Sequence, residues 1–245
     1  MSTVARIDAE RFPPFDPATS GRFSDWLRSS AGPTWQQALD HRFFREVAAD
    51  QVEDDVFERY LRIEYGFVDC AAIMLGYAVA KAPSFVERRK LAVGLYGLVT
   101  DQQAYFVKAF DRMQTPAASR SGLAPAGSFA GLHELFLSTA RLKGYEEILC
   151  CILAAEWMYL TWCRRAHRTT SGRGYIRDWV ALHAGGAFER HVTWTRGEID
   201  VRGPFLPPAM QSGMRALFDS VLTAEIAFHD AAYGPSDKPL RSADI

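Results

Sequence analysis

The chain has 245 residues, of which 48% are hydrophobic and 23% charged, and its formal net charge is −1. This length fits one large domain or two small ones, with enough apolar side chains for a substantial core. A near-neutral charge without a basic run gives no reason to expect nucleic-acid binding, and the longest apolar run, Ile148 to Ala155, is too short to cross a bilayer. We therefore expect neither nucleic acid nor membrane as a partner.

The cysteines and the N-terminus both favour a cytoplasmic location. Residues Met1 to Asp8 contain no apolar signal core. The four cysteines fall inside helical patterns and show no CxxC spacing. We expect them to be reduced, buried thiols.

Helical periodicity dominates the chain after a lead-in rich in Pro, Ser and Thr at residues 1–20, which we expect to be flexible. The expected helices are Phe23–Ser29, Pro33 to about Ala49, Asp54 to about Lys81, Ser84 to about Met113, Phe129–Leu142, Tyr145 to about His167, Tyr175–Ala184, Phe188 to about Ile199 and Pro208 to about Tyr233. Loops rich in Pro and Gly separate them, the longest at residues 114–128. No stretch shows sustained strand alternation. The predicted fold class is all-α, a single domain at residues 21–235 of about eight to ten helices, followed by a tail at 236–245.

Three glutamates interrupt the apolar stripes of three of these helices. Glu64 lies four residues after Tyr60 and three before Phe67, Glu156 lies three before Tyr159, and Glu225 lies three before Phe228. Residues at these spacings share one helix face, which should turn inward. An isolated buried carboxylate is costly unless it is paired or neutral. Three such residues on separate helices suggest a shared polar pocket.

Such a pocket can do several kinds of chemistry. Carboxylates in a half-dry site have raised pKa values and can exchange protons near neutral pH, hold an amine-bearing ligand or bind a metal. The alternative is that each glutamate pairs with an Arg or Lys of a neighbouring helix. Aromatic residues beside a buried carboxylate would suit a flat heterocycle, although such residues are core by default.

Metal ligation has little support. Helical di-iron sites use Glu-x-x-His pairs, and this chain has none, its nearest pairing being Glu225-x-x-x-His229. The six histidines show no HxxxH or HExxH spacing. We predict no metal, and keep a carboxylate-bridged metal oxygenase with His133, His183 and His229 as an alternative.

An ordered set of motifs resembles the TenA family, the thiaminase II-like proteins of the haem-oxygenase-like fold. The similar segments span about residues 24 to 234 and are Trp35, His41 to Phe44, Phe57 to Tyr65, Tyr145 to Leu149 with Trp157 and Tyr159, Trp179 with His183 and Phe188, and Glu225 to Phe228. The resemblance implies a haem-oxygenase-like helical bundle with a central pocket for a 4-amino-2-methylpyrimidine. It also implies hydrolysis in thiamine salvage, no metal or organic cofactor, and a homo-oligomer (tetramer or dimer).

The chain departs from the family pattern at several positions. Where the family has Gln-Asp, this chain has Ile63-Glu64. His183 stands at the position of one pocket tyrosine of the family, and the position of a second pocket tyrosine falls near Leu132. The position of the nucleophilic cysteine falls on Ala155, directly before Glu156.

Loss of the cysteine points away from thiaminase chemistry, which needs a nucleophile that adds to the pyrimidine ring. It points toward a branch of the family that uses a glutamate, here Glu156. Cys151, one turn before Ala155, is the alternative nucleophile.

The resemblance therefore implies an aminopyrimidine aminohydrolase that acts on an aminomethyl or formylaminomethyl pyrimidine. The alternatives are the metal oxygenase and a non-catalytic binding or regulatory protein. The expected catalytic residues are Glu225, Glu156 and Tyr159, and the expected substrate-binding residues are Glu64, Phe67 and His183.

Overall fold

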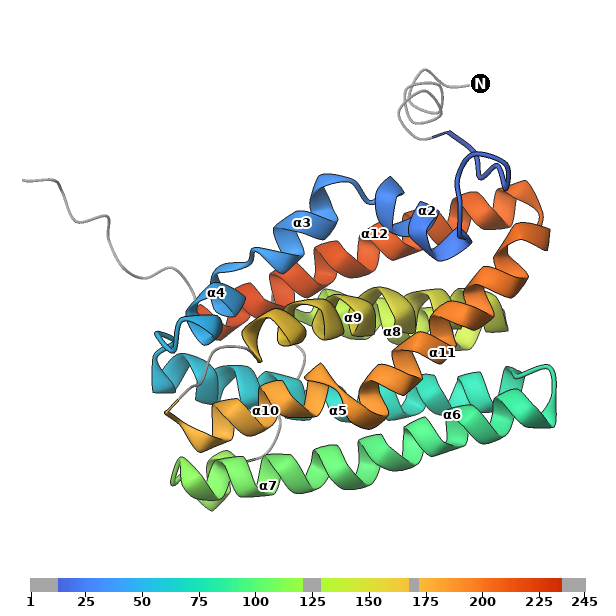
Figure 1. The fold of residues 1–245 in the computed structure, drawn as a ribbon. Coiled ribbons are helices and arrows are strands. Elements are labelled where there is room, and N and C mark those ends of the chain that lie inside the picture. The colour runs from blue at the N-terminus through green and yellow to red at the C-terminus, as the bar shows by residue number, and fades with distance from the viewer. Residues whose placement is uncertain (1–12, 121–128, 168–171, 235–245) are drawn as a thin grey trace, which may run out of the picture.

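The computed structural model describes residues 13–120, 129–167 and 172–234, and within these ranges the chain is helical without a strand. Figure 1 shows the arrangement of the helices. Their bounds are α2 Phe23–Ser30, α3 Pro33–Leu39, α4 Arg42–Ala48, α5 Asp54–Lys81, α6 Phe85–Gly97, α7 Gln103–Arg112, α8 Ala130–Leu142, α9 Tyr145–Ala166, α10 Gly174–Ala184, α11 Gly186–Arg202 and α12 Pro208–Asp230. The prediction of an all-α fold is confirmed.

The ends of the chain are described only in part. Residues 1–12 of the expected lead-in and the expected tail lie outside the described residues, as do parts of two expected loops, 121–128 and 168–171. The described part of the lead-in contacts α2. Phe15 packs edge-on against Phe23 at 5.0 Å, and the Trp26 indole donates a hydrogen bond to the Pro13 carbonyl at 3.1 Å.

Three long helices, α5, α9 and α12, form the centre of the bundle. α12 packs against α9 and is covered by α2 and α3, while α5 packs against α6 and α8. In Figure 1 the blue α2–α4 run along the red α12 on one side, and the green α6 and α7 run along the opposite side. α10 and α11 pack against α9, and in Figure 1 they run between α9 and α7.

Helix α9 is the most buried of the long helices and carries two of the central polar residues, Glu156 and Tyr159. The Glu147 carboxylate accepts a hydrogen bond from the Gly144 N–H at 2.9 Å, which satisfies a free donor at the start of the helix. Arg164 in the last turn complements the helix dipole. Since α9 contacts helices on several sides, Glu156 and Tyr159 lie in the interior rather than at its edge.

Two of the expected helices are divided. The helix expected from Pro33 to about Ala49 stops at Leu39 and starts again at Arg42. His41 has extended backbone angles, and its Nδ1 accepts a hydrogen bond from the Phe43 N–H at 3.1 Å, so it caps a new helix. The apolar spacing continues across this break, which is why periodicity alone merged the two helices.

The second division is a π-helical turn, Leu98–Gln102, between α6 and α7. Gly97 directly before the turn and Gln103 directly after it both keep helical backbone angles, so the change does not interrupt the run of helical residues. The Thr100 hydroxyl donates to the Tyr96 carbonyl at 2.6 Å within this segment. Such turns are frequent at functional sites.

Helices α10 and α11 meet at Gly185 and Gly186. The φ of Gly186 is +61°, in the left-handed region that residues with a side chain rarely adopt. The sharp turn places His183 and Phe188 close together, with ring centroids 5.1 Å apart. The expected break at these glycines is confirmed.

Among the described helices, α5 is long and apolar enough to cross a membrane by length and composition. In the fold it packs against α6, α8 and α9 and has Glu64 buried in its middle.

Candidate active site

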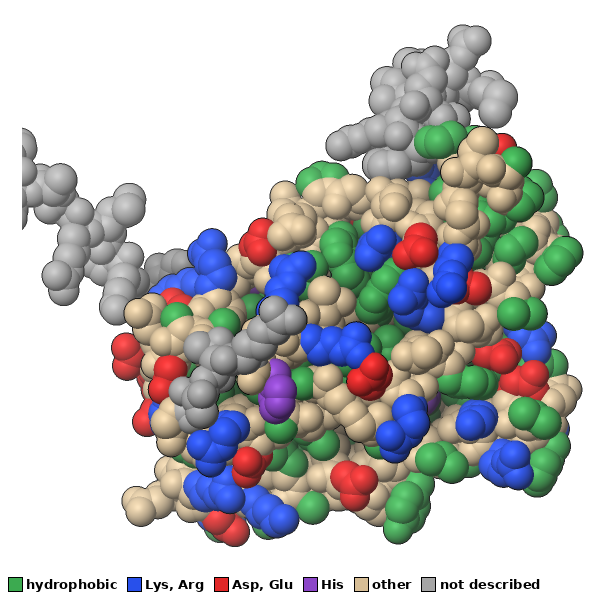
Figure 2. All heavy atoms as spheres, in the orientation of Figure 1, with side chains coloured by type: hydrophobic (Ala, Val, Ile, Leu, Met, Phe, Trp, Pro, Cys, Tyr) green, Lys and Arg blue, Asp and Glu red, His purple; other side chains and the backbone are tan. Residues whose placement is uncertain are grey.

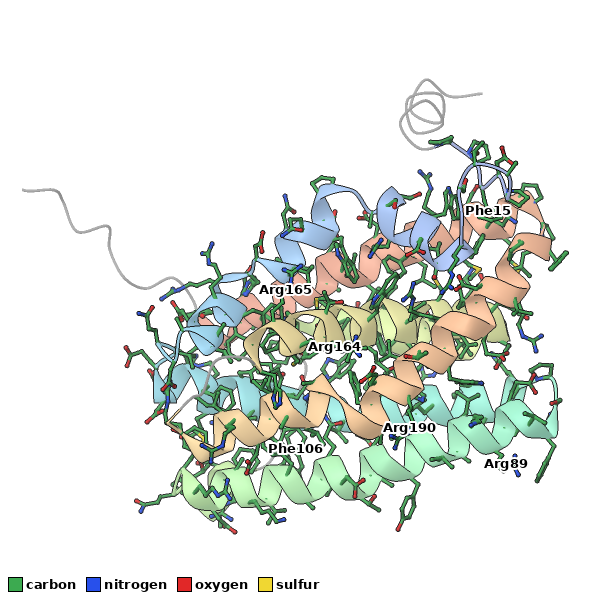
Figure 3. All side chains as sticks on the ribbon, viewed as in Figure 1. Phe15, Arg89, Phe106, Arg164, Arg165 and Arg190 are labelled. Atoms are coloured by element: carbon green, nitrogen blue, oxygen red, sulfur yellow. The ribbon has the colours of Figure 1, made fainter. Side chains whose placement is uncertain are left out.

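A cavity of about 900 Å³ lies inside the bundle, bordered by α5, α6 with its π turn, α8, α9, α10, α11 and α12. On the face shown in Figure 2, Lys and Arg side chains lie among hydrophobic side chains over α6 and α11. Arg89 of α6 and Arg190 of α11, which are labelled in Figure 3, line the cavity. All six residues selected from the sequence line it: Glu64, Phe67, Glu156, Tyr159, His183 and Glu225.

Glu64 lies beside two tyrosine hydroxyls. Its Oε2 is 3.3 Å from the Tyr60 hydroxyl and 3.4 Å from the Tyr159 hydroxyl, and these hydroxyls are 3.2 Å apart. Burial raises the pKa of Glu64 to about 7, although the hydrogen bond from the Tyr60 hydroxyl acts in the opposite direction. Near neutral pH this carboxyl therefore exists in both forms and can either donate or accept a proton.

The ring of His229 is held in one tautomer. Its Nδ1 is 2.7 Å from the Glu225 carbonyl oxygen, which only accepts, so Nδ1 carries the hydrogen. Burial, followed by the neighbouring His41, lowers the pKa of His229 to about 3. The neutral ring then accepts at Nε2, and the Tyr159 hydroxyl, 3.0 Å away, donates to it. The oxygen of Tyr159 is left as an acceptor on the side of Glu64.

Glu225 is the most deeply buried acid of the cavity, with 2% of its surface exposed. Its Oε2 has no hydrogen-bond partner among the described residues. The His229 Nδ1 lies 3.7 Å from this oxygen but is neutral, so the contact is not an ion pair. Burial and then the charge of Glu64 raise the pKa of Glu225 well above its usual value. Glu225 is therefore a neutral acid with a free oxygen at the cavity.

Glu156 has a partner that the sequence analysis did not identify. Its Oε2 lies 3.3 Å from Nε2 of His191 on α11, and both side chains line the cavity. The lack of metal-ligand spacing among the histidines gives His191 no predicted role. One signal was available, since His191 lies three residues after Phe188 and four before Thr195, which places it on the inward face of its helix.

Phe67 and His183 provide two further walls. Phe67 packs edge-on against Phe136 and Phe228, with centroids 4.9 and 5.6 Å away. The His183 Nδ1 is 2.9 Å from the Trp179 carbonyl, so it donates there, and burial lowers the pKa of His183 to about 4. The neutral ring keeps a lone pair on Nε2, an acceptor suited to a ligand amino group.

The expected nucleophile position has no thiol. Ala155 lines the cavity, as does Leu132 at the position of the second family tyrosine. Cys151 is fully buried and lies outside the cavity lining. Burial raises the pKa of its thiol well above the usual value, which disfavours the reactive thiolate.

The histidines of the metal alternative do not converge. Within the described ranges no three His, Cys, Asp or Glu side chains are grouped so that they could hold a metal ion. His133 and His229 lie outside the cavity lining, and His183 lines it. Each of the three directs Nδ1 to the carbonyl four residues earlier on its own helix.

Solved structures share this fold. A TenA homologue from P. horikoshii OT3 superposes with a TM-score of 0.77 at 18% identity, covering 86% of this chain and 98% of its own. A TenA family transcription regulator from Silicibacter sp. TM1040 gives a TM-score of 0.79 at 15% identity, covering 90% and 100%. The architecture is the haem-oxygenase-like helical bundle that the resemblance implied.

Sequence comparison gives the family. The sequence model of the TENA/THI-4/PQQC family matches residues 28–234, and the chain belongs to this family. The aminopyrimidine aminohydrolase of Bacillus subtilis (strain 168) is 18% identical over 226 residues, which covers 91% of this chain and 96% of that protein. The aminopyrimidine aminohydrolase of Helicobacter pylori is 17% identical over 212 residues, covering 86% and 98%.

Proposed function

We propose that this protein hydrolyses an aminomethyl or formylaminomethyl derivative of 4-amino-2-methylpyrimidine in thiamine salvage, by carboxylate acid/base catalysis. The observation that carries the proposal is the pair of buried acids, Glu64 and Glu225, facing one cavity without a thiol at the nucleophile position. The two relatives named aminopyrimidine aminohydrolase support the same reaction.

Glu64 is proposed to recognise the pyrimidine edge. A 4-aminopyrimidine presents an N–H donor beside a ring-nitrogen acceptor. A protonated carboxyl matches this pair, since its O–H can donate to the ring nitrogen while its other oxygen accepts from the amino group. The pKa of Glu64, raised to about 7 by burial, keeps a large share of this form at neutral pH.

Glu225 and Glu156 are proposed to carry the proton transfers. The bond between the methylene carbon and nitrogen breaks, and Glu225 gives its proton to the departing amine. Water supplies the oxygen that bonds to the carbon, and Glu156 takes the proton that this water loses. The products are the hydroxymethyl pyrimidine and the departing amine, which is ammonia from the aminomethyl compound and formamide from the formylaminomethyl compound. A neutral acid and a paired carboxylate in one cavity suit these opposite tasks.

The remaining residues would position the ring. Tyr159 donates to His229, which orients its oxygen toward Glu64. Phe67 offers an aromatic wall, and the free Nε2 of His183 can accept a hydrogen bond where the family has a tyrosine. We further propose that the chain belongs to the glutamate-type branch, since Ala155 cannot act as a nucleophile.

We also propose that the protein is a cytoplasmic homo-oligomer. All four cysteines are free thiols, as suits a reducing compartment. The outer face of α6 and α7 exposes large apolar side chains, with Phe85, Tyr96 and Val107 exposed by 77%, 69% and 49%. Leu91 is the one buried residue of α6. A face of this kind suits a second copy of the chain.

Ligand screening with an activity readout tests the proposed function. Thiamine and the aminomethyl and formylaminomethyl pyrimidines are screened for a rise in unfolding temperature, and formation of the hydroxymethyl pyrimidine is then measured with each compound that binds, together with ammonia release from the aminomethyl compound. We expect the aminomethyl pyrimidine to stabilise the protein and to release ammonia catalytically. Stabilisation without turnover of any of these compounds would leave a binding protein and would refute the hydrolase.

A further inference from the structure

Glu156 and His191 form a polar centre separate from Glu64 and Glu225. The Glu156 Oε2 and His191 Nε2 atoms are 3.3 Å apart, on α9 and α11. Neither atom has a hydrogen-bond partner among the described residues. Each atom is therefore available to interact with the other atom and with a ligand in the cavity. The two side chains are 22% and 13% exposed.

Gly94 on α6 makes room for this histidine. A Cβ at position 94 would lie 2.9 Å from Cε1 and 3.0 Å from Nδ1 of the His191 ring. Carbon atoms do not approach this closely, so any side chain at position 94 would displace the ring. Three helices therefore meet at this point: α6 supplies the gap, α11 the imidazole and α9 the carboxylate.

The contact with Glu156 favours the protonated form of His191. Burial is the largest single influence and lowers the pKa of His191, but the charge of Glu156 and its polar contact with the ring together outweigh burial, and the pKa is raised overall. The other charged or titratable side chains that line the cavity are Arg89, Lys90 and Asp101 of α6 and the π turn, Tyr159 on α9, His167 after α9, His183 on α10, Arg190 on α11, Glu64 on α5 and Glu225 on α12. Among these neighbours Glu156 is the carboxylate in contact with the ring.

We propose that His191, lodged against Gly94, is a positioning residue that holds the Glu156 side chain toward the cavity. Its catalytic meaning rests on the proposed function, in which Glu156 takes the proton of the attacking water. The two acids then have opposite surroundings, since Glu225 is buried without a cation and Glu156 is paired with one. An enzyme separates its acid from its base in this manner.

The pair can be tested without any substrate. The titration of His191 is followed by NMR of the histidine rings, with its signal assigned by its loss in His191→Gln. In Glu156→Gln, which keeps the size of the side chain and removes the charge, we expect the titration midpoint of His191 to fall. An unchanged midpoint would mean that the pair does not form in solution and would overturn the proposal.

A matched pair of glycine substitutions tests the gap. In Gly94→Ala we expect a displaced ring, a lowered His191 midpoint and turnover reduced by about 10- to 100-fold, as misplaced catalytic groups typically cause. In Gly197→Ala, on α11, the new methyl meets nothing within 4 Å, and both quantities should stay at the wild-type values. A wild-type midpoint in Gly94→Ala would contradict the proposal. If the wild-type protein hydrolyses none of the compounds but the His191 midpoint still falls in Glu156→Gln and Gly94→Ala, the proposed function is refuted. The contact between Glu156 and His191 is then still supported.

Discussion

Glu64 and Glu225 are two acids in which the fold opposes ionisation. Both are almost completely buried, and burial is the largest cause of the raised pKa of each. A group kept neutral by its surroundings can donate a hydrogen bond or a proton where an exposed glutamate cannot. The arrangement costs stability, and this cost is measurable.

Glu64 should make folding stability depend on pH. Its folded pKa of about 7 lies above the usual 4.5, so between these values the unfolded chain releases a proton that the folded protein keeps. The contribution of Glu64 to the free energy of unfolding is therefore largest below pH 4.5. It falls by about 3 kcal/mol in total as pH rises toward 7. Urea unfolding of wild type and Glu64→Gln at pH 5 and pH 8 measures this contribution.

We expect the loss of stability between these two pH values to be smaller in Glu64→Gln than in wild type. The same substitution at the exposed Glu134 of α8 is the control for a general effect of the charge change. Equal pH dependence in wild type and Glu64→Gln would contradict the raised pKa of Glu64.

Cys151 should be dispensable for turnover. It is fully buried and lies outside the cavity lining, and its thiol resists ionisation. In Cys151→Ala we expect wild-type kcat, with some loss of stability from the removed sulfur atom. Ammonia release and thermal unfolding check the two parts, and a large fall in kcat in a folded variant would restore a thiol mechanism.

At the scale of elements, periodicity predicted the long helices well and their interruptions poorly. The inward positions of Glu64 and Glu225 follow from the 3–4 spacing of their neighbours, because a regular helix repeats that spacing along its length. The π turn at Leu98–Gln102 and the break at His41 depend on local hydrogen bonds that leave the apolar pattern unchanged. For the same reason the pattern gave His191 no partner, since its partner lies on another helix.

The contact between the loop before α12 and α2 depends on a glycine. A Cβ at Gly203 would lie 2.6 Å from Cε1 of Phe23, whose ring is fully buried. Gly203→Ala should therefore destabilise the protein by about 1–3 kcal/mol. Chemical denaturation measures this loss.

Gly213→Ala on α12 is the matched control. The new methyl meets nothing within 4 Å and lies on an exposed helix position, so we expect a gain of about 0.5–1 kcal/mol. Equal effects of the two substitutions would contradict the close packing of Gly203 on Phe23.

At the scale of the whole molecule, the cavity is a product of how the helices pack. The sequence predicted that three stripe glutamates share a pocket, and all three line one cavity. It could not predict that Glu156 faces His191 rather than Glu225, because the rotation of α11 against α9 is set by contacts such as the one at Gly94. The expected reaction came from the resemblance to a family, whereas the packing of the helices determines which side chains contact each other in the cavity.

The exposed apolar face of α6 and α7 should control the oligomeric state. In a Phe85→Glu, Tyr96→Glu double variant, two charges replace the most exposed aromatic side chains of α6, 77% and 69% exposed. We expect wild type to be an oligomer and this variant to be a monomer by light scattering coupled to size exclusion. A monomeric wild type, or an oligomeric variant, would contradict an interface at this face.

The central claim is that buried carboxyl groups of the cavity carry out hydrolysis, and Glu225→Gln tests it most directly. Glutamine resembles the neutral acid in size and charge, so the variant should fold normally and bind the aminomethyl pyrimidine, but it has no proton to give to the departing amine. Proton transfer by a positioned group is typically worth about 10²–10⁴-fold, so we predict that kcat for ammonia release falls at least about 100-fold. Wild-type turnover in Glu225→Gln would contradict the account.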